Sequence, residues 1–229
     1  AAEGEASMGI PSALEDRFTH LVLFDTKTTG IDPTREEIIE IGAVSITAGE
    51  EDSSFNALIR LSPSRTLPPF ITELTGITAE QLDRSGIEKT TAAESFCKLL
   101  EREDTLLVAY NAQFDLNFIY YLLREQGRTA SLKNLKFLDA LTVYKDRRDY
   151  PYKLKDAIAA YGLEGEVENS HRAVDDARAM TALLWAMAEE KDDLLEYVNL
   201  FGYHPKYGVS GKRISSITYM PQGFRRDIP

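Results

Sequence analysis

An apolar run that ends in a carboxylate is the feature that most constrains how this chain can fold. Residues 21–24 read Leu-Val-Leu-Phe, Asp25 follows directly, and a polar turn then closes on Gly30. Four consecutive apolar residues suit a strand that is buried on both faces. An aspartate would be a poor core residue there, but the end of such a strand is a suitable place for a ligand of a divalent cation. Because side chains two apart on a strand share a face, Asp25 and Lys27 are expected to point into the same space.

The order of the other predicted elements indicates an α/β domain. The opening run and the segments at residues 37–46 and 55–60 read as three strands joined by short turns, which favours an antiparallel meander. Helical spacing then alternates with short strands: helices are expected at 90–100, 114–124, 152–161 and 172–188, and strands at 105–110 and 136–140. A meander followed by alternating helix and strand predicts a mixed sheet with helices on its faces.

Composition narrows the class of protein. The net charge is −11 and the pI is near 4.9, which argues against a protein that coats duplex DNA electrostatically. An enzyme that handles only the end of a strand stays open, because metal ions can supply local positive charge. The single cysteine, Cys97, suggests a reducing compartment, and no run of membrane-spanning length or signal-peptide pattern is visible. We therefore expect a cytoplasmic protein with no membrane partner.

Three segments are expected along the chain. Residues 1–18 begin with small and polar residues and are expected to be an expression remnant or a linker from a longer polypeptide. Residues 19–190 hold the predicted domain, and residues 191–229 form a C-terminal extension in which basic and aromatic side chains alternate. Such a composition suits contact with the end of a nucleic-acid strand. A tail that wraps over the domain with exposed charges is the commoner explanation of the same pattern.

Two further segments place acids beside the ends of predicted elements. Asp115 opens a helix directly after a strand, and Asp176 lies near the start of a helix that His171 precedes. Each has a structural explanation by itself. An acid in the first turn of a helix commonly caps it or complements its dipole, and a lone histidine before a helix is commonly structural.

Together and in this order, the three segments resemble the motifs of the DEDDh, or DnaQ-like, 3′–5′ exonucleases, the family of the proofreading epsilon subunit of bacterial DNA polymerase III. The family motifs read Asp-Thr-Glu-Thr-Thr-Gly, His-Asn-Ala-x-Phe-Asp and His-x-Ala-x-x-Asp. The matching segments here run from Asp25 to Gly30, from Tyr110 to Asp115 and from His171 to Asp176. The resemblance covers about residues 21–188.

The resemblance implies a ribonuclease H-like fold with a five-stranded mixed sheet, and hydrolysis at the 3′ end of single-stranded DNA or RNA. It implies a two-metal mechanism with Mg²⁺ or Mn²⁺ as cofactor. A polymerase or another nucleic-acid-processing protein is the expected protein partner. By matching position, the resemblance implies that Asp25, Asp115 and Asp176 are metal ligands and that His171 is the general base. It also implies a pocket for the 3′-terminal nucleotide, lined by Thr28, Thr29, Asn111 and Phe114.

Lys27 departs from the family pattern at a position where the family has a metal-binding glutamate. Three aspartates supply three negative charges and Lys27 supplies one positive charge, so the net charge of −2 balances about one divalent ion rather than two. An ammonium within ~4 Å of a divalent ion is repelled by several kcal/mol at the effective dielectric of a partly buried site. Lys27 is therefore expected to point into the carboxylates in place of a metal charge, or to extend its flexible stem into solvent.

Three hypotheses follow from this substitution. The chain is an exonuclease whose catalysis is intact or reduced; or it is a pseudonuclease that binds nucleic-acid ends or a protein partner without cutting; or Lys27 was introduced into an ordinary enzyme to trap substrate. We expect an exonuclease with a metal site weakened at Lys27.

Overall fold

A five-stranded mixed sheet forms the centre of the computed structural model, which describes residues 12–167, 170–200, 203–204 and 208–209. The strand order is β3-β2-β1-β4-β5, with β1, β2 and β3 antiparallel and β4 and β5 parallel to β1. The arrangement confirms the predicted meander followed by parallel strands. The strands are β1 His20–Thr28, β2 Ile38–Thr47, β3 Glu50–Leu58, β4 Thr105–Ala109 and β5 Lys136–Asp139.

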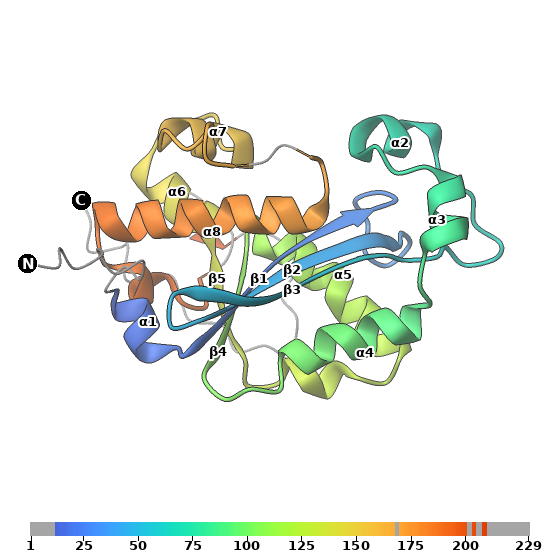
Figure 1. Ribbon diagram of the computed structural model, residues 1–229, viewed down its shortest axis with the longest axis horizontal. Coiled ribbons are helices and arrows are strands. Elements are labelled where there is room, and N and C mark those ends of the chain that lie inside the picture. Colours follow the sequence, from blue (N-terminus) through green and yellow to red (C-terminus); the bar gives the residue numbers. More distant parts are fainter. Residues whose placement is uncertain (1–11, 168–169, 201–202, 205–207, 210–229) are drawn as a thin grey trace, which may run out of the picture.

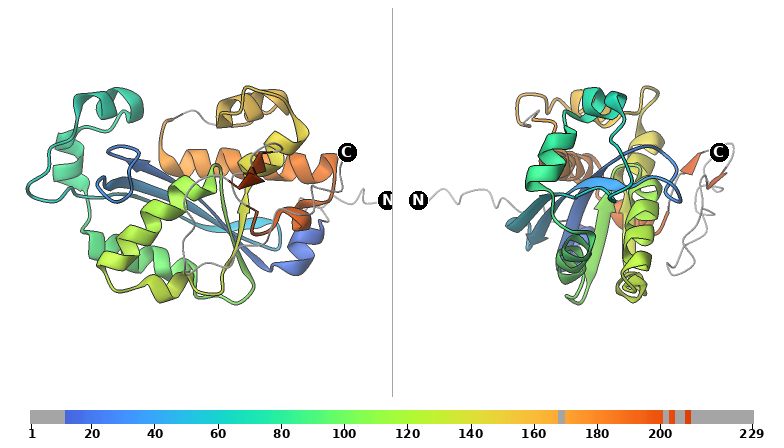
Figure 2. Two further views of the ribbon diagram at one scale, coloured as in Figure 1. Left: turned by 180° about the vertical axis from the view of Figure 1, so that it is seen from behind. Right: turned by 90° about the vertical axis from the view of Figure 1, so that its right-hand side faces the viewer.

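Helices cover both faces of the sheet (Figure 1). β1 contributes alternate residues to the two cores. On one face Leu21 and Leu23 pack in the core that includes the long helix α8 (Ala173–Glu190). On the other face Val22 and Phe24 pack in the core that includes α4 (Lys89–Leu99) and α5 (Ala112–Glu125). The end-on view in Figure 2 shows these layers. Since strand side chains alternate, Asp25 and Lys27 continue on the α8 face and Thr26 on the α5 face.

The β2–β3 connection is tighter than the sequence indicates. We expect the third strand to begin near residue 55, but β3 begins at Glu50. Ala48 and Gly49 both have positive φ, 53° and 80°, which is the geometry of a two-residue hairpin turn. The first half of β3 is exposed and polar, so its backbone pairing with β2 defines the strand, and apolar alternation could not reveal it.

Smaller helices extend the two layers. α1 (Ala13–Arg17), α6 (Ala140–Arg147) and α7 (Leu154–Ala160) contribute to the α8-side core, and α7 lies above α8 in Figure 1. α2 (Pro69–Thr75) and α3 (Ala79–Ser85) form a small cluster at the other end of the molecule. The remaining elements are the 3₁₀ helices η1 (Thr129–Leu132) and η2 (Leu194–Tyr197) and the two-stranded sheet of β6 (Tyr203–His204) and β7 (Gly208–Val209).

Parts of the two expected flanking segments belong to the packed domain. Leu14, inside the segment 1–18 expected to be a linker, is fully buried. Leu194 and Tyr197, inside the expected extension 191–229, are buried in the same core. The basic and aromatic residues beyond position 200 lie outside the residues whose side chains are described. Within the described ranges, no helix combines the length and the hydropathy that crossing a bilayer requires.

Candidate active site at the ends of β1, α5 and α8

Lys27 lies between two of the three predicted metal ligands. Its Nζ is 2.5 Å from Asp176 Oδ2 and 3.2 Å from Asp25 Oδ2. The side chains of Lys27 and Asp25 are 22% and 24% exposed, so solvent screens these ion pairs only in part. Of the two orientations expected for Lys27, the structure has the one that points into the carboxylates.

Asp176 reaches this position because the first turn of α8 lies directly on β2. A Cβ added to Gly42 would be 2.0 Å from the backbone nitrogen of Val174 and 2.2 Å from the carbonyl carbon of Ala173. Such distances leave no room for any side chain, so the glycine permits this close approach of helix and strand. The first turn of α8 therefore lies on the sheet face to which Asp25 and Lys27 belong.

Asp115 is held from the other side of β1. Its Oδ1 accepts hydrogen bonds from the backbone nitrogen of Thr26, at 3.1 Å, and from the Thr26 hydroxyl, at 2.5 Å. The side chain is buried, and it lies in the first turn of α5, which begins after Asn111 adopts a left-handed conformation with φ 63°. Side chains alternate between the two faces along β1, so Asp25 and Lys27 lie on the face of α8, and Thr26 lies on the face of α5.

Burial and neighbouring charges shift the pKa values of these groups. Burial raises the pKa of Asp25 to about 7, against the opposing effect of Lys27. Burial and then the charge of Asp25 raise the pKa of Asp115 well above its ordinary value. Burial alone would lower the pKa of Lys27, but the charges of Asp25 and Asp176 outweigh it and raise that pKa above its ordinary value. Lys27 is therefore a permanent cation at neutral pH, and it stabilises the ionised form of Asp25.

The donor atoms suit a divalent ion, but the charge and geometry with Lys27 in place do not. Three carboxylates are the oxygen donors that Mg²⁺ and Mn²⁺ prefer, and Asp25 Oδ2 is buried without a hydrogen bond among the described residues. The Lys27 ammonium, however, already pairs with both Asp25 and Asp176, so the negative charge that would hold a divalent ion is partly neutralised. No group of three or more His, Cys, Asp or Glu side chains in the described part of the chain is placed to hold a metal ion. As arranged, these residues do not fit two divalent ions.

His171 is not joined to the carboxylates. It is exposed, lies two residues before α8 and has a left-handed backbone with φ 62°. Among the described residues, no hydrogen bond or ion pair connects its ring with Asp25, Asp115 or Asp176. Its predicted role as general base therefore stays a prediction.

The two threonines predicted to line the nucleotide pocket shape the turn that follows β1. The Thr28 hydroxyl donates to the Gly30 carbonyl at 2.6 Å. The Thr29 hydroxyl donates to Glu36 Oε2 at 2.5 Å and accepts from the backbone nitrogen of Glu37 at 2.9 Å. Both hydroxyls are therefore engaged within the protein.

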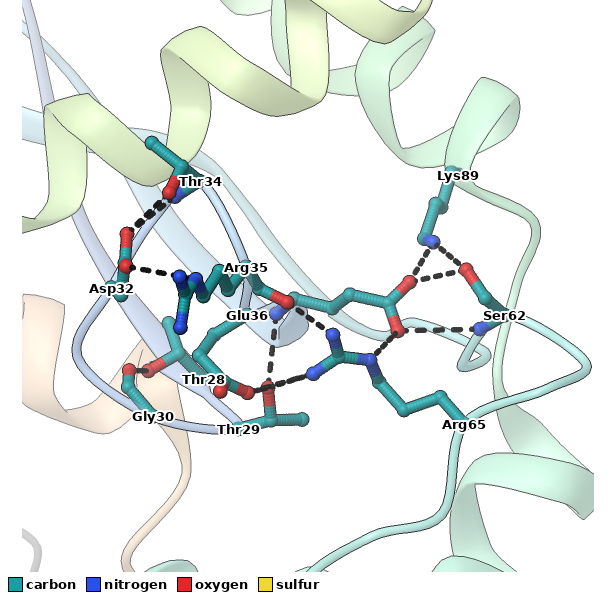
Figure 3. A network of polar contacts seen from close by, with 11 residues as sticks. Thr28, Thr29, Gly30, Asp32, Thr34, Arg35, Glu36, Ser62, Arg65 and Lys89 are labelled. Atoms are coloured by element: carbon teal, nitrogen blue, oxygen red, sulfur yellow. Dashed lines mark hydrogen bonds and ion pairs between the residues drawn. The ribbon is translucent and has the colours of Figure 1, made fainter.

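A charged network fixes this turn to the rest of the domain (Figure 3). Arg65 Nη1 is 2.7 Å from Glu36 Oε2, and Arg65 Nε is 3.2 Å from Glu37 Oε2. Lys89 pairs with Glu37 and donates to the Ser62 hydroxyl at 2.6 Å. A cleft of about 280 Å³ opens beside the network and is lined in part by α5. The network ties the β1–β2 turn to the loop at 62–65 and to the start of α4.

Asn111 and Phe114, the other two predicted pocket residues, lie at the start of α5. Asn111 is exposed, and its backbone nitrogen donates to Asp139 Oδ1 at 2.9 Å. Phe114 is half-buried, and its ring centroid is 5.1 Å from that of Phe118. Asp139, which also accepts from Leu141 at 3.0 Å, holds the loop that presents Asn111.

Sequence reasoning overlooked two buried acids near the site, Asp139 and Glu40. Glu40 lies in the middle of β2, is fully buried, and accepts a hydrogen bond from the first residue of α8, Ala173. The signal was present in the sequence, since Glu40 interrupts the otherwise apolar run Ile38-Ile39-Glu40-Ile41. A charged residue inside a buried strand requires a partner.

Comparison with known proteins identifies relatives over most of the domain. A family model described as RNase T exonuclease matches residues 22–184. DNA polymerase III PolC-type of Clostridium perfringens is 40% identical over 166 residues, which are 71% of this chain and 11% of that protein. The 3′–5′ exonuclease DinG of Staphylococcus haemolyticus is 32% identical over 179 residues, which are 77% of this chain and 19% of that protein. The chain thus spans less than a fifth of the length of the curated relatives it matches.

Solved structures of E. coli exonuclease I share the fold. Its complex with a dT13 oligonucleotide has a TM-score of 0.69 at 17% identity and covers 78% of this chain and 43% of that chain. A second exonuclease I structure has a TM-score of 0.71 at 18% identity, with the same coverage. At this identity the likeness establishes the ribonuclease H-like fold and no more. With the family model matched over most of its length and three motifs in order, the chain belongs to the RNase T exonuclease family, the DnaQ-like 3′–5′ exonucleases.

Proposed function

We propose that this chain is a 3′–5′ exonuclease domain that hydrolyses phosphodiester bonds at the 3′ ends of single-stranded DNA or RNA, and that Lys27 weakens its metal site. The supporting observation is the convergence of three acids from distant motifs. Asp25 at the end of β1 and Asp176 on α8 meet at the Lys27 ammonium, and Asp115 on α5 is held by the residue between Asp25 and Lys27.

Each residue of the site has a chemical task in this proposal. Asp25, Asp115 and Asp176 offer the ligand oxygens for Mg²⁺ or Mn²⁺, and Lys27 has to leave before two ions can be held. If Lys27 moved away, these three carboxylates would hold the ions, and the ions would supply positive charge beside the scissile phosphate. His171 would accept a proton from the attacking water, a task that suits an imidazole.

The start of α5 and the turn after β1 form the proposed pocket for the terminal nucleotide. Phe114 offers a half-buried ring and Asn111 an exposed amide, while Thr28 and Thr29 shape the turn through their hydrogen bonds. An aromatic ring suits stacking on a base of any sequence. Sequence-independent degradation is the expected consequence.

The relatives suggest the biological setting. The match to DNA polymerase III PolC-type supports a role in DNA replication or repair, with a polymerase or a further part of a larger protein as partner. The exonuclease I complex with dT13 supports single-stranded DNA as the substrate. The single, buried Cys97 is consistent with a reducing, cytoplasmic location.

A pseudonuclease is the second candidate, and the same ion pairs favour it. Lys27 already neutralises Asp25 and Asp176 at 3.2 and 2.5 Å, so these groups need no bound ion. In that case the domain would bind nucleic-acid ends, or a protein partner, without cutting.

Degradation of labelled oligonucleotides separates the two candidates. The unaltered chain and its Lys27→Glu variant are incubated with single-stranded DNA and RNA labelled at the 5′ end, with Mg²⁺ or Mn²⁺. Stepwise shortening from the 3′ end is expected for both proteins. Lys27→Glu is expected to be faster by roughly 100-fold, the size of effect that one electrostatic contact in an active site typically has.

Two controls make the result decisive. Lys98→Glu introduces the same charge change on the exposed side of α4 and is expected to leave the rate unchanged. Asp115→Asn is expected to abolish cleavage, which excludes a contaminating nuclease. Cleavage by Lys27→Glu alone would support the pseudonuclease, and no cleavage by either protein would contradict the proposed exonuclease.

A further inference from the structure

We propose that Glu40 is a positioning residue that holds the first turn of α8, and with it His171 and Asp176, against the carboxyl end of β1. The inference rests on the proposed function, because it assigns Glu40 a part in the same reaction. Glu40 is fully buried in the middle of β2, where an unpartnered carboxylate would be strongly destabilising. Its partners identify what it does there.

The three partners that Glu40 has among the described residues lead to the start of α8. Oε1 accepts a hydrogen bond from the backbone nitrogen of Ala173 at 2.8 Å. Oε2 is 3.2 Å from Nε of Arg172 and accepts from Asn56 Nδ2 at 3.1 Å. Asn56 in turn accepts through Oδ1 from the backbone nitrogen of Val174 at 3.0 Å. Two strands of the sheet thus bond the first two residues of the helix.

These bonds replace a cap that the helix lacks. The first four backbone N–H groups of a helix have no partner within it, and a side chain just before the helix commonly accepts one of them. Arg172 is the N-cap residue of α8, and its side chain makes no capping hydrogen bond. Glu40 supplies the acceptor from the sheet instead, and its negative charge also suits the positive end of the helix dipole.

Such a cap fixes the helix relative to the sheet, which a local cap cannot do. Glu40 and Gly42 are two apart on β2 and share the face on which the first turn of α8 lies. Asp176 lies three residues after Ala173, and its carboxylate reaches Lys27 at 2.5 Å. A loss of the bond to Ala173 would free this turn to shift, and with it Asp176.

His171 depends on the same contacts through the backbone. Its left-handed conformation, φ 62°, is one that residues other than glycine adopt only when their surroundings impose it. The next residue, Arg172, is tied to Glu40 by its guanidinium and to Ser170 by its backbone nitrogen, at 3.2 Å. Glu40 therefore helps to impose the conformation that presents His171 ahead of the helix.

Variants of Glu40 test the assignment in the unaltered chain and in Lys27→Glu. Glu40→Ala removes both the acceptor and the charge, whereas Glu40→Gln keeps an acceptor for Ala173 but loses the charge that faces Arg172. We expect Glu40→Ala to lower kcat on a labelled single-stranded oligonucleotide by roughly 10- to 100-fold, the effect of displacing a catalytic group by about 1 Å. KM is expected to change little, and Glu40→Gln is expected to recover part of kcat.

Glu51→Gln is the matched control. Glu51 also joins the sheet to α8, through Arg178 at 3.0 Å, but the pair is exposed and lies further along the helix. This variant is expected to leave kcat unchanged. A folded Glu40→Ala variant with the parent's kcat, a loss confined to KM, or an equal loss in Glu51→Gln would overturn the proposal.

Amide hydrogen exchange tests the clamp without any need for activity. Glu40→Ala is expected to lose protection at the Ala173 amide and, by loosening Asn56, at Val174, while the later turns of α8 stay protected. Unchanged protection at Ala173 would overturn the proposal even if no variant cuts. The absence of cleavage in every variant, with protection lost as expected, would instead contradict the proposed function. If Glu40→Ala does not fold, Asn56→Ala replaces it in both measurements, because it removes the acceptor for the Val174 amide and a donor to Glu40. A lower kcat and lost protection at Val174 are then expected, and parental values of both would overturn the proposal.

Discussion

Lys27 and the carboxylates of Asp25 and Asp176 stabilise one another, because each alone would be a half-buried charge without a partner of opposite sign. The Lys27 ammonium lies between Asp25, two positions away on β1, and Asp176 on α8. The position could be inferred from the sequence only as one of two alternatives. The choice between them depends on where α8 places Asp176.

Replacement of Lys27 by a neutral residue is expected to lower the free energy of unfolding and to strengthen the binding of divalent cations. In metal-free buffer near pH 8, Lys27→Met should lower the free energy of unfolding by about 1–3 kcal/mol, less than a fully buried pair because about a fifth of the side chain is exposed. Mn²⁺ should then stabilise the variant more than the parent, since a ligand that binds only the folded state adds its binding free energy. Thermal unfolding with and without Mn²⁺ measures both effects. Lys98→Met, on an exposed site, should show neither, and an equal gain in variant and parent would contradict the argument.

The buried ring of His20 makes the free energy of unfolding depend on pH. The ring is buried between Thr105 Oγ1, 2.8 Å from Nδ1, and Ser45 Oγ, 2.7 Å from Nε2. Burial and then Arg102 lower its pKa, against the effect of Asp52. The unfolded chain therefore takes up the proton at a higher pH than the folded one. The stability that His20 contributes is complete above about pH 6.5 and is lost as the pH falls from there through the folded pKa.

The comparison with His20→Gln measures this contribution. Between about pH 7.5 and about pH 5, the free energy of unfolding should fall further in the parent than in the variant, by about 1.4 kcal/mol for each unit by which the pKa is lowered. Urea denaturation at several pH values provides the curves. Parallel curves for the two proteins would show that the pKa of His20 is not lowered.

Among the elements, the contact of α8 with β2 sets the geometry of the site. The strand provides a glycine where the helix backbone approaches, and an acid two residues earlier where the helix begins. Both features are visible in the segment 38–42 once the partner is known. Nothing in that segment, however, says which helix lies on it.

Gly42→Ala is expected to separate the two elements. A methyl group 2.0 Å from the Val174 nitrogen has to displace backbone, and overpacking of this kind costs typically about 1–3 kcal/mol. Urea denaturation should show this loss, and any exonuclease activity should fall with it. Gly165→Ala is the matched control, because its Cβ would meet nothing within 4 Å and should change stability by less than about 0.5 kcal/mol. Equal stability of the two variants would contradict the close contact.

Elements with a pattern of their own could be predicted, and elements defined by their surroundings could not. The run at residues 21–24 and the periodicity of α5 and α8 announce a strand and two helices. α6 escaped prediction because it begins directly after β5 with Asp139 as its cap, at 3.0 Å from the Leu141 nitrogen, and no loop residues separate the two. The three acids are predicted as metal ligands because each belongs to a recognisable motif, whereas a role for Glu40 requires knowledge of which helix lies above it.

For the whole molecule, the packed core extends beyond the matched family segment at both ends. The family model covers residues 22–184, but α1 before it and η2 after it share the core of α8, and they contact each other. The sequence suggested a boundary at residue 19 because the segment before it begins with small and polar residues. The buried apolar side chains at residues 14, 194 and 197 show that the packed core includes residues outside the boundaries suggested by composition.

Leu14→Ala tests whether α1 stabilises the molecule. Leu14 is fully buried, so its truncation is expected to lower the free energy of unfolding by about 2–5 kcal/mol. Leu74→Ala, at a leucine that is 74% exposed, should change it by less than about 0.5 kcal/mol. Calorimetry of the two variants gives the comparison. A loss as small for Leu14→Ala as for Leu74→Ala would mean that residues 12–18 do not belong to the cooperative unit.

The cap from Glu40 to Ala173 joins residues 133 positions apart in the chain, and the pair of Lys27 with Asp176 spans 149 positions. The site is therefore completed by a helix late in the sequence, and the first turn of that helix makes both contacts. Any event that lifts this turn, whether transient local opening or a partner that competes for it, would disassemble the site while the sheet stays folded. The active fraction of such a domain would equal the fraction of molecules in which the first turn of α8 is bound to the sheet.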